Sequence, residues 1–250
     1  MNHTLEKLDA GDPVLGAWVL SGSRRVAEVM ARTELDWLGI DTEHAPYSPE
    51  RVESLVTTIA SKATPIVRLP SVDAAVAGKA KQALDVGAGG VIIPNVETVE
   101  QAESAVAAAQ FPPAGRRGVA GTVRANEYGE AFDEYIDRAN EQTLIAFQIE
   151  SQQGAASADD ILAVEGLDVV LIGSNDLSAS MGYPGDKNHP EVRAAIEGVF
   201  EAARTHDVVP GIAGRTPAEK DKLIGEGFQF ILLGADVSFM RSGVAPFFSE

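Results

Sequence analysis

The sequence predicts an α/β fold and, within that class, a (β/α)8 TIM barrel formed by residues 1–250 as a single domain. Short apolar runs alternate with stretches of helical periodicity along the whole chain, and no linker or low-complexity segment interrupts them. Such alternation is typical of parallel sheets whose strands are joined by helices. The number of units and the length of 250 residues favour a closed barrel over an open doubly wound sheet.

Each strand is expected where a short apolar run is followed by a turn signal, because parallel strands are buried on both faces. The expected strands cover residues 14–19, 37–40, 65–67, 90–93, 116–119, 144–149, 167–172, 208–212 and 230–233, of which 116–119 is the weakest. The expected helices cover residues 26–31, 49–59, 74–84, 97–109 and 190–205. A further helix opens near Asp176, and a long irregular segment runs through Tyr128 and Tyr135.

Polar residues follow several of the expected strands, at the ends where a barrel places its active site. These residues are Asp41, Glu43, His44, Arg68, Gln148, Glu150, Ser174, Asn175 and Asp176. Three other expected strands end at Pro94, Gly211 and Gly234, which leave room rather than supply chemistry. We therefore expect one site, assembled at the carboxyl-terminal rim of the barrel.

Two carboxylates are expected to meet at this rim, because Glu150 and Asp176 follow two consecutive strands. They repel each other unless a proton or a cation lies between them, so a bound divalent metal ion is the simplest interpretation. The pattern also allows Asp176 to be an acid favoured in the first turn of a helix and Glu150 a solvated loop residue. Taken alone, His44 fits a surface or capping residue, and Arg68 fits a structural ion pair.

The composition excludes several classes of protein. The chain has no cysteine, which rules out a disulfide scaffold, a thiolate nucleophile and a cysteine zinc cluster. Its formal net charge of −17 argues against nucleic acid as a partner, because phosphates would be repelled. The amino-terminal residues resemble no secretion signal and no apolar run reaches membrane-spanning length, so no membrane partner and a cytoplasmic location are expected. The acidity also suggests a cytoplasm rich in salt, that is, a halophilic protein.

Four ordered motifs together resemble the HpcH/HpaI aldolases, the metal-dependent class II aldolases of 2-keto-3-deoxy acids. The motifs are DTEHAP at residues 41–46, PPAGRRGV at 112–119, QIE at 148–150 and GSNDLS at 173–178. The resemblance extends from Gly16 to about Gly234, nearly the full chain. It implies a barrel of the phosphoenolpyruvate/pyruvate-binding type. It also implies reversible cleavage of a 4-hydroxy-2-oxo acid to pyruvate and an aldehyde.

The resemblance also implies roles for individual residues. Glu150 and Asp176 match the two metal ligands, for which Mg, Mn or Co is suitable. Arg68 matches the arginine that stabilises the developing enolate, His44 the residue assigned to proton transfer, and Asp41 the carboxylate that orients it. The substrate-binding set comprises Arg68, Gln148, Ser174, Asn175 and Asp85. Within it, the backbone amides of Asn175 and Asp176 would hold the pyruvate carboxylate, which is sound chemistry for a helix amino terminus.

Asp85 resembles an acid that reaches the site of a neighbouring subunit, so the family's hexamer, a trimer of dimers, is implied as well. The loop near Ser23 departs from the family pattern, since it carries Arg24 and Arg25. These two arginines would select an aldehyde with an acidic or phosphorylated tail, or they simply form a solvated helix start.

Three other interpretations compete with that of a metal-dependent aldolase. A lysine Schiff base is disfavoured, because no lysine ends an apolar run. A citrate-lyase-β-like or malyl-CoA-type lyase shares the barrel and the carboxylates, although the chain shows no evident basic platform for the nucleotide. A non-catalytic protein that binds keto acids would retain affinity without turnover.

Overall fold

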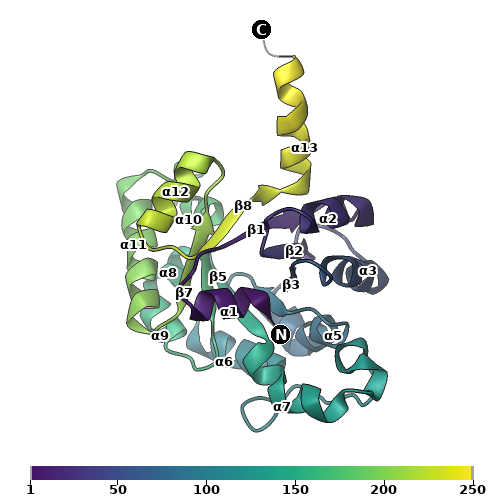
Figure 1. Ribbon diagram of the computed structural model, residues 1–250. Coiled ribbons are helices and arrows are strands. Elements are labelled where there is room, and N and C mark those ends of the chain that lie inside the picture. Colours follow the sequence, from purple (N-terminus) through teal and green to yellow (C-terminus); the bar gives the residue numbers. More distant parts are fainter. Residues whose placement is uncertain (1, 249–250) are drawn as a thin grey trace.

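The computed structural model describes residues 2–248, which form a closed barrel of eight parallel strands in the order β1 to β8 (Figure 1). The strands are β1 Val14–Val19, β2 Trp37–Asp41, β3 Thr64–Arg68, β4 Gly90–Ile93, β5 Leu144–Ile149, β6 Val169–Ile172, β7 Val209–Ala213 and β8 Phe230–Ala235. Almost every strand residue is buried, as expected for strands covered on both faces. The prediction of a (β/α)8 barrel is confirmed.

Helices surround the barrel between successive strands. The α-helices are α1 His3–Asp9, α2 Arg24–Ala31, α3 Pro49–Ile59, α4 Val72–Ala74, α5 Ala80–Asp85, α6 Val99–Ala109, α7 Phe132–Gln142, α8 Gln152–Ala156, α9 Ala158–Leu162, α10 Ser174–Ser180, α11 Pro190–Thr205, α12 Pro217–Gly225 and α13 Asp236–Val244. Short helical turns cover η1 Ala75–Lys79, η2 Arg124–Gly129 and η3 Ala245–Phe247. Side-chain caps begin several of them; the Ser48 hydroxyl, for example, accepts from the Arg51 N–H and so starts α3.

Aromatic rings fill the interior of the barrel. Trp37 is fully buried, stacks on Phe230 with ring centroids 4.3 Å apart, and meets Trp18 edge-on at 5.8 Å. Gly16 makes room for this packing, because a Cβ there would lie only 2.0 Å from the Trp37 indole. The stack closes the barrel interior below the carboxyl-terminal rim and separates that rim from the opposite end.

The first helix covers the amino-terminal end of the barrel (Figure 1). Leu5 and Leu8 of α1 belong to the same buried cluster as the interior aromatic rings. The Asn2 amide donates to the Gly89 carbonyl at 2.7 Å, which fixes the start of the helix against the strands.

The expected strand at residues 116–119 is wrong. The Arg116 and Arg117 amides donate to the Ala107 and Gln110 carbonyls, so this segment caps the end of α6 instead of joining a strand. Its one buried side chain, Arg117, turns inward to an ion pair with Asp85 at 2.7 Å. Because the only buried side chain of this segment is a charged one, residues 116–119 have no apolar face that could pack in a sheet.

Two helical expectations need correction as well. The single helix expected at 74–84 is divided into α4, the π-helical turn η1 and α5, because Gly78 adopts a φ of +115°. The expected irregular segment through Tyr128 and Tyr135 contains η2 and the helix α7, Phe132–Gln142. Tyr135 lies on α7 and packs edge-on against Phe111 at 5.9 Å, which anchors the helix to the barrel.

The last helix leaves the barrel. Figure 1 shows α13 standing away from the strands, with the carboxyl terminus at its far end. The buried Asp236 carboxylate holds its base, since it accepts the Leu20 and Ser21 amides at 3.0 Å. Large apolar side chains are exposed along the helix and just beyond it, namely Val237, Phe239, Met240, Val244, Phe247 and Phe248. Within residues 2–248, no helix combines the length and the apolar composition needed to cross a membrane.

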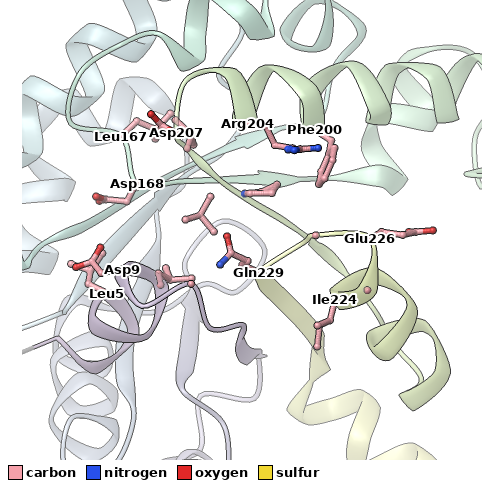
Figure 2. Close-up of a pocket in the computed structure, with 17 residues that line it drawn as sticks. Leu5, Asp9, Leu167, Asp168, Phe200, Arg204, Asp207, Ile224, Glu226 and Gln229 are labelled. Atoms are coloured by element: carbon pink, nitrogen blue, oxygen red, sulfur yellow. The ribbon is translucent and has the colours of Figure 1, made fainter.

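A large cavity lies at the amino-terminal ends of β6, β7 and β8, away from the predicted site. Its volume is about 780 Å³, and Figure 2 shows its lining side chains, including Asp9, Asp168 and Arg204. Burial raises the pKa of Asp168 from 3.8 to about 6, although its carboxylate accepts the Ile145 amide at 2.7 Å. Barrel enzymes carry out their chemistry at the opposite end, so size alone does not make this cavity the active site.

Asp168→Asn is expected to raise the free energy of unfolding by about 1–3 kcal/mol near neutral pH. A folded-state pKa above the ordinary value of 3.8 means that the folded chain binds this proton more tightly than the unfolded chain. The charge therefore costs stability increasingly as pH rises from about 4 to about 6, and fully above that range. Urea unfolding of both proteins across this range measures the difference, which should vanish near pH 4. A difference that is constant with pH would contradict the assignment.

Candidate active site

An ion pair between neighbouring strands organises the carboxyl-terminal rim. Asp41 of β2 lies opposite Arg68 of β3 in the strand register, so their side chains leave the sheet on the same face. The Asp41 carboxylate is fully buried and accepts both Nε and Nη2 of Arg68, at 3.0 and 2.6 Å. A bidentate pair of this kind fixes the plane of the guanidinium group.

Three further contacts aim the Arg68 guanidinium at the centre of the rim. It lies 4.4 Å from the centroid of the Trp18 ring, in a cation–π arrangement. Its Nη1 atom is 3.0 Å from the Glu43 carboxylate and 3.5 Å from the Gln148 amide oxygen. The cation therefore faces the end of β5, where Glu150 lies.

Glu150 follows β5 and is nearly buried, with 8% of its surface exposed. The Gln148 amide donates to its carboxylate. Burial, and to a smaller extent the negative charges of Glu43 and Asp176, raise the pKa of Glu150 to about 7. Gly173 makes room for this side chain, since a Cβ there would lie 2.7 Å from a Glu150 oxygen. Burial therefore makes the ionised form of Glu150 costly, and the charge of Arg68 offsets only part of that cost.

Asp176 lies in the first turn of α10, directly beyond β6. It lines a cavity of about 200 Å³ at the rim together with Ser174 and Asn175 of the same turn and His44, Arg68 and Gln148. These are six of the nine polar residues expected at the rim, while Asp41, Glu43 and Glu150 are not among the residues that line the cavity. The first-turn amides of a helix have no partner within the helix, so they are available to an anion there.

His44 lies at the mouth of this cavity with 63% of its side chain exposed. Its backbone amide donates to the Asp41 carboxylate at 3.2 Å, whereas its ring Nε2 is 3.5 Å from the Glu43 carboxylate. Asp41 therefore fixes the backbone of the turn that carries His44, and the carboxylate nearest the ring belongs to Glu43. Burial raises the pKa of Glu43, and the Arg68 charge opposes that shift.

Three of the residues singled out from the sequence lie elsewhere. Asp85, at the end of α5, borders a separate cavity of about 440 Å³ between α3 and α5 and is paired with Arg117. Arg24 donates to the Thr58 hydroxyl at 3.1 Å on the outer surface, and Arg25 is exposed beside it. Neither arginine lines the rim cavity.

Sequence reasoning missed two residues of the rim, Trp18 and Arg215, which line the cavity. Glu43, which was expected at the rim, lies between Arg68 and His44. Arg215 follows the end of β7, so the rule that selected Asp176 was able to find it. Trp18 is an apolar residue inside β1, and only the strand register reveals that it faces the rim.

A (β/α)8 barrel with a charged cavity at its carboxyl-terminal rim is the architecture of an enzyme. The family model for HpcH/HpaI aldolase/citrate lyase matches residues 15–242. A hydroxypyruvate/pyruvate aldolase from Sagittula stellata is 39% identical over 96% of this chain and 94% of its own length. A 2-keto-3-deoxy-L-rhamnonate aldolase from Salmonella gallinarum is 40% identical over 94% of this chain and 87% of its own.

A crystal structure of an HpcH/HpaI aldolase/citrate lyase family protein from Burkholderia cenocepacia agrees with this fold. It has a TM-score of 0.92 and 35% identity, covering 98% of this chain and 97% of that one. The chain belongs to the HpcH/HpaI aldolase/citrate lyase family. It is accordingly a keto-acid aldolase, a carbon–carbon lyase.

Proposed function

We propose that the chain, acting as one barrel domain, reversibly cleaves a 4-hydroxy-2-oxo acid to pyruvate and an aldehyde with the help of a divalent metal ion. The observation that carries this proposal is the convergence of Glu150, Asp176 and the Arg68 guanidinium on one rim of the barrel. Cleavage beside a hydroxyl group leaves an electron pair that must move into the neighbouring carbonyl, and these groups suit that charge.

The donor set fits a metal ion bound largely through water and substrate. Within residues 2–248, no three His, Cys, Asp or Glu side chains are grouped to hold a metal ion. Two carboxylates remain, Glu150 and Asp176, and such a pair with several waters and substrate oxygens suits Mg²⁺, Mn²⁺ or Co²⁺. When bound, the ion would draw electrons from the substrate carbonyl. The Gly173 backbone leaves the Glu150 carboxylate the room to adjust.

The other rim residues divide the remaining work. The α10 amides of Asn175 and Asp176, with Ser174 beside them, would hold the carboxylate of the keto acid. Gln148 would orient the Glu150 carboxylate and the substrate carbonyl beside it. These contacts fix the breaking bond relative to the Arg68 guanidinium.

Proton transfer would pass through His44, directly or through a water molecule. The His44 ring would remove the proton of the 4-hydroxyl group as the bond between C3 and C4 breaks, and the aldehyde forms. The electron pair moves to C3 and the C2 oxygen as an enolate, which Arg68 would stabilise, and the proton taken up by His44 would then pass to C3, directly or through water, to give pyruvate. Asp41 supports both steps, because it fixes Arg68 and the backbone of His44.

His44→Ala is expected to lower kcat by about a hundredfold, because general acid–base groups contribute at least that much. Binding of Mn²⁺ should change little, since the histidine ring is not part of the proposed donor set. His3→Ala is the matched control, as His3 lies exposed on α1. Stopped assays of pyruvate release measure the loss. Full activity in the His44 variant would remove this residue from the mechanism.

One assay tests the proposed function against its alternatives. Metal-stripped protein is reconstituted with single divalent ions and offered pyruvate or hydroxypyruvate with a panel of aldehydes, and separately malyl-CoA. Metal-dependent formation of an aldol from pyruvate supports the proposal. Turnover of malyl-CoA alone would favour the malyl-CoA-type lyase, and keto-acid binding without turnover would favour a binding protein.

We also propose a homo-oligomer, a hexamer built as a trimer of dimers. The apolar side chains exposed along α13, such as Phe239, Met240 and Val244, support an interface there, because contiguous apolar surface marks contact sites. Asp85 would then face the site of a neighbouring subunit, consistent with its place outside the rim cavity of its own chain. Light scattering of the purified protein measures its mass and shows whether that mass corresponds to six chains.

We further propose a cytoplasmic location, and the acidic composition supports adaptation to high salt. A net charge of −17 destabilises a fold through self-repulsion, which salt screens. Melting temperatures should therefore rise between low and molar potassium chloride. Equal melting temperatures would count against adaptation to salt. The same charge is unfavourable for nucleic acid as a partner.

A further inference from the structure

Arg215 stands at the mouth of the rim cavity, two residues beyond the end of β7. It lines the same cavity of about 200 Å³ as His44 and Asp176. Its side chain is exposed, and within residues 2–248 its guanidinium group makes no ion pair or hydrogen bond. A free cation therefore borders the entrance to the site.

The loop that carries Arg215 is fixed by the backbone. The Arg215 amide donates to the Glu219 carboxylate at 2.9 Å, and the Gly214 amide donates to the Leu232 carbonyl at 3.0 Å. The Thr216 hydroxyl caps α12 immediately afterwards. A Cβ at Gly214 would lie 3.2 Å from the Lys220 backbone, which shows how closely the loop packs on the helix. Arg215 is thus presented from a rigid base, with only its side chain free to move.

The charges around the rim leave Arg215 as the cation that is available to an anionic substrate. The other cation of the cavity, Arg68, already serves the Asp41 and Glu43 carboxylates. With Glu150 and Asp176 also present, an anionic substrate would meet repulsion at the entrance unless a free cation received it. The planar guanidinium group matches carboxylate and phosphate oxygens in a bidentate manner.

We propose that Arg215 binds an anionic group, a carboxylate or a phosphate, at the end of the aldehyde remote from its carbonyl. This inference rests on the proposed aldolase function and names the class of aldehyde that the site selects. In that function the keto-acid carboxylate occupies the α10 amides, so the solvent-facing mouth is left for the far end of the other reactant. The geometry assigns this selection to Arg215 and away from Arg24 and Arg25, which lie outside the cavity.

Matched pairs of aldehydes test the proposal with pyruvate as donor. One pair is succinic semialdehyde and its methyl ester, and the other is glyceraldehyde 3-phosphate and glyceraldehyde. Arg215→Ala should lower kcat/KM at least tenfold for the anionic member of one pair or both, and change the neutral members less than twofold. The affected pair identifies the anion as carboxylate or phosphate. The double variant Arg24→Ala and Arg25→Ala is the matched control and should leave every ratio unchanged.

Ionic strength supplies a second measurement. In the unchanged protein, kcat/KM for the preferred anionic aldehyde should fall with added salt, and Arg215→Ala should remove that dependence. Equal losses for charged and neutral aldehydes, or a rise in KM for pyruvate alone, would place Arg215 elsewhere and overturn the proposal. So would unchanged ratios in a variant that still turns over. No turnover of any aldehyde by the unchanged protein would instead contradict the proposed function itself.

Discussion

Asp176→Asn should lower kcat/KM for aldol cleavage by about a thousandfold, the loss expected when several kcal/mol of charge stabilisation disappear. The substitution keeps the size of the side chain and its place in the first turn of α10, but removes one of the two carboxylates of the proposed donor set. The single buried carboxylate of Glu150 that remains is a poor site for a divalent cation. Steady-state kinetics at saturating Mn²⁺ measure the loss.

Asp168→Asn is the matched control for this experiment. It makes the same chemical change just before β6, whereas Asp176 follows that strand at the active rim. The control should retain normal kcat/KM and gain stability at neutral pH. If Asp176→Asn kept activity within a few-fold of the unchanged protein, this carboxylate would not belong to the metal site.

Arg68→Lys is expected to lower kcat by about a hundredfold to a thousandfold, the usual effect of removing a preorganised donor to a developing oxyanion. Lysine keeps the positive charge but cannot repeat the bidentate contact with Asp41 or the stacking on Trp18. Because Asp41 is fully buried, the variant should also lose about 2–4 kcal/mol of unfolding free energy. Kinetics and urea unfolding at one pH measure the two effects.

Chemical rescue separates catalysis from stability at this position. In Arg68→Ala, millimolar guanidinium should restore part of kcat, since the cavity and the Asp41 carboxylate that receive it remain. Ammonium at the same concentration should restore less, because it lacks the planar set of donors. Normal kcat in Arg68→Lys would show that a positive charge alone is sufficient for catalysis and that the fixed plane of the guanidinium group is not required.

The sequence was informative about the barrel because burial on both faces leaves continuous apolar runs, and β1, β5 and β6 stand out for that reason. It misled at residues 116–119, where valine, glycine and arginine fit a weak strand by pattern. In the fold, Arg117 is drawn inward by Asp85, a partner 32 residues away that local pattern does not contain. The helix α7 was not predicted either, because its many polar residues obscure the helical spacing of its apolar residues.

At the site, most of the cavity was located by the expectation that active-site residues follow the carboxyl ends of the strands. This expectation failed where the end of a strand was predicted at the wrong residue. The residues considered at the end of the expected strand 208–212 stop at Gly211, whereas β7 ends at Ala213, so Arg215 lies outside them. The partners of Asp41 also lay beyond sequence reasoning, because only the register between β2 and β3 sets it against Arg68. Chain order brought His44 close to Asp41, whereas three-dimensional packing put its ring nearest Glu43.

The most direct test of the account is the binding of Mn²⁺ to metal-stripped protein, followed by electron paramagnetic resonance. We predict one ion per chain in the unchanged protein and loss of that ion in the double variant Glu150→Gln and Asp176→Asn, with the fold intact by circular dichroism. Equal stoichiometry and affinity in the two proteins would contradict the claim that these carboxylates hold the metal.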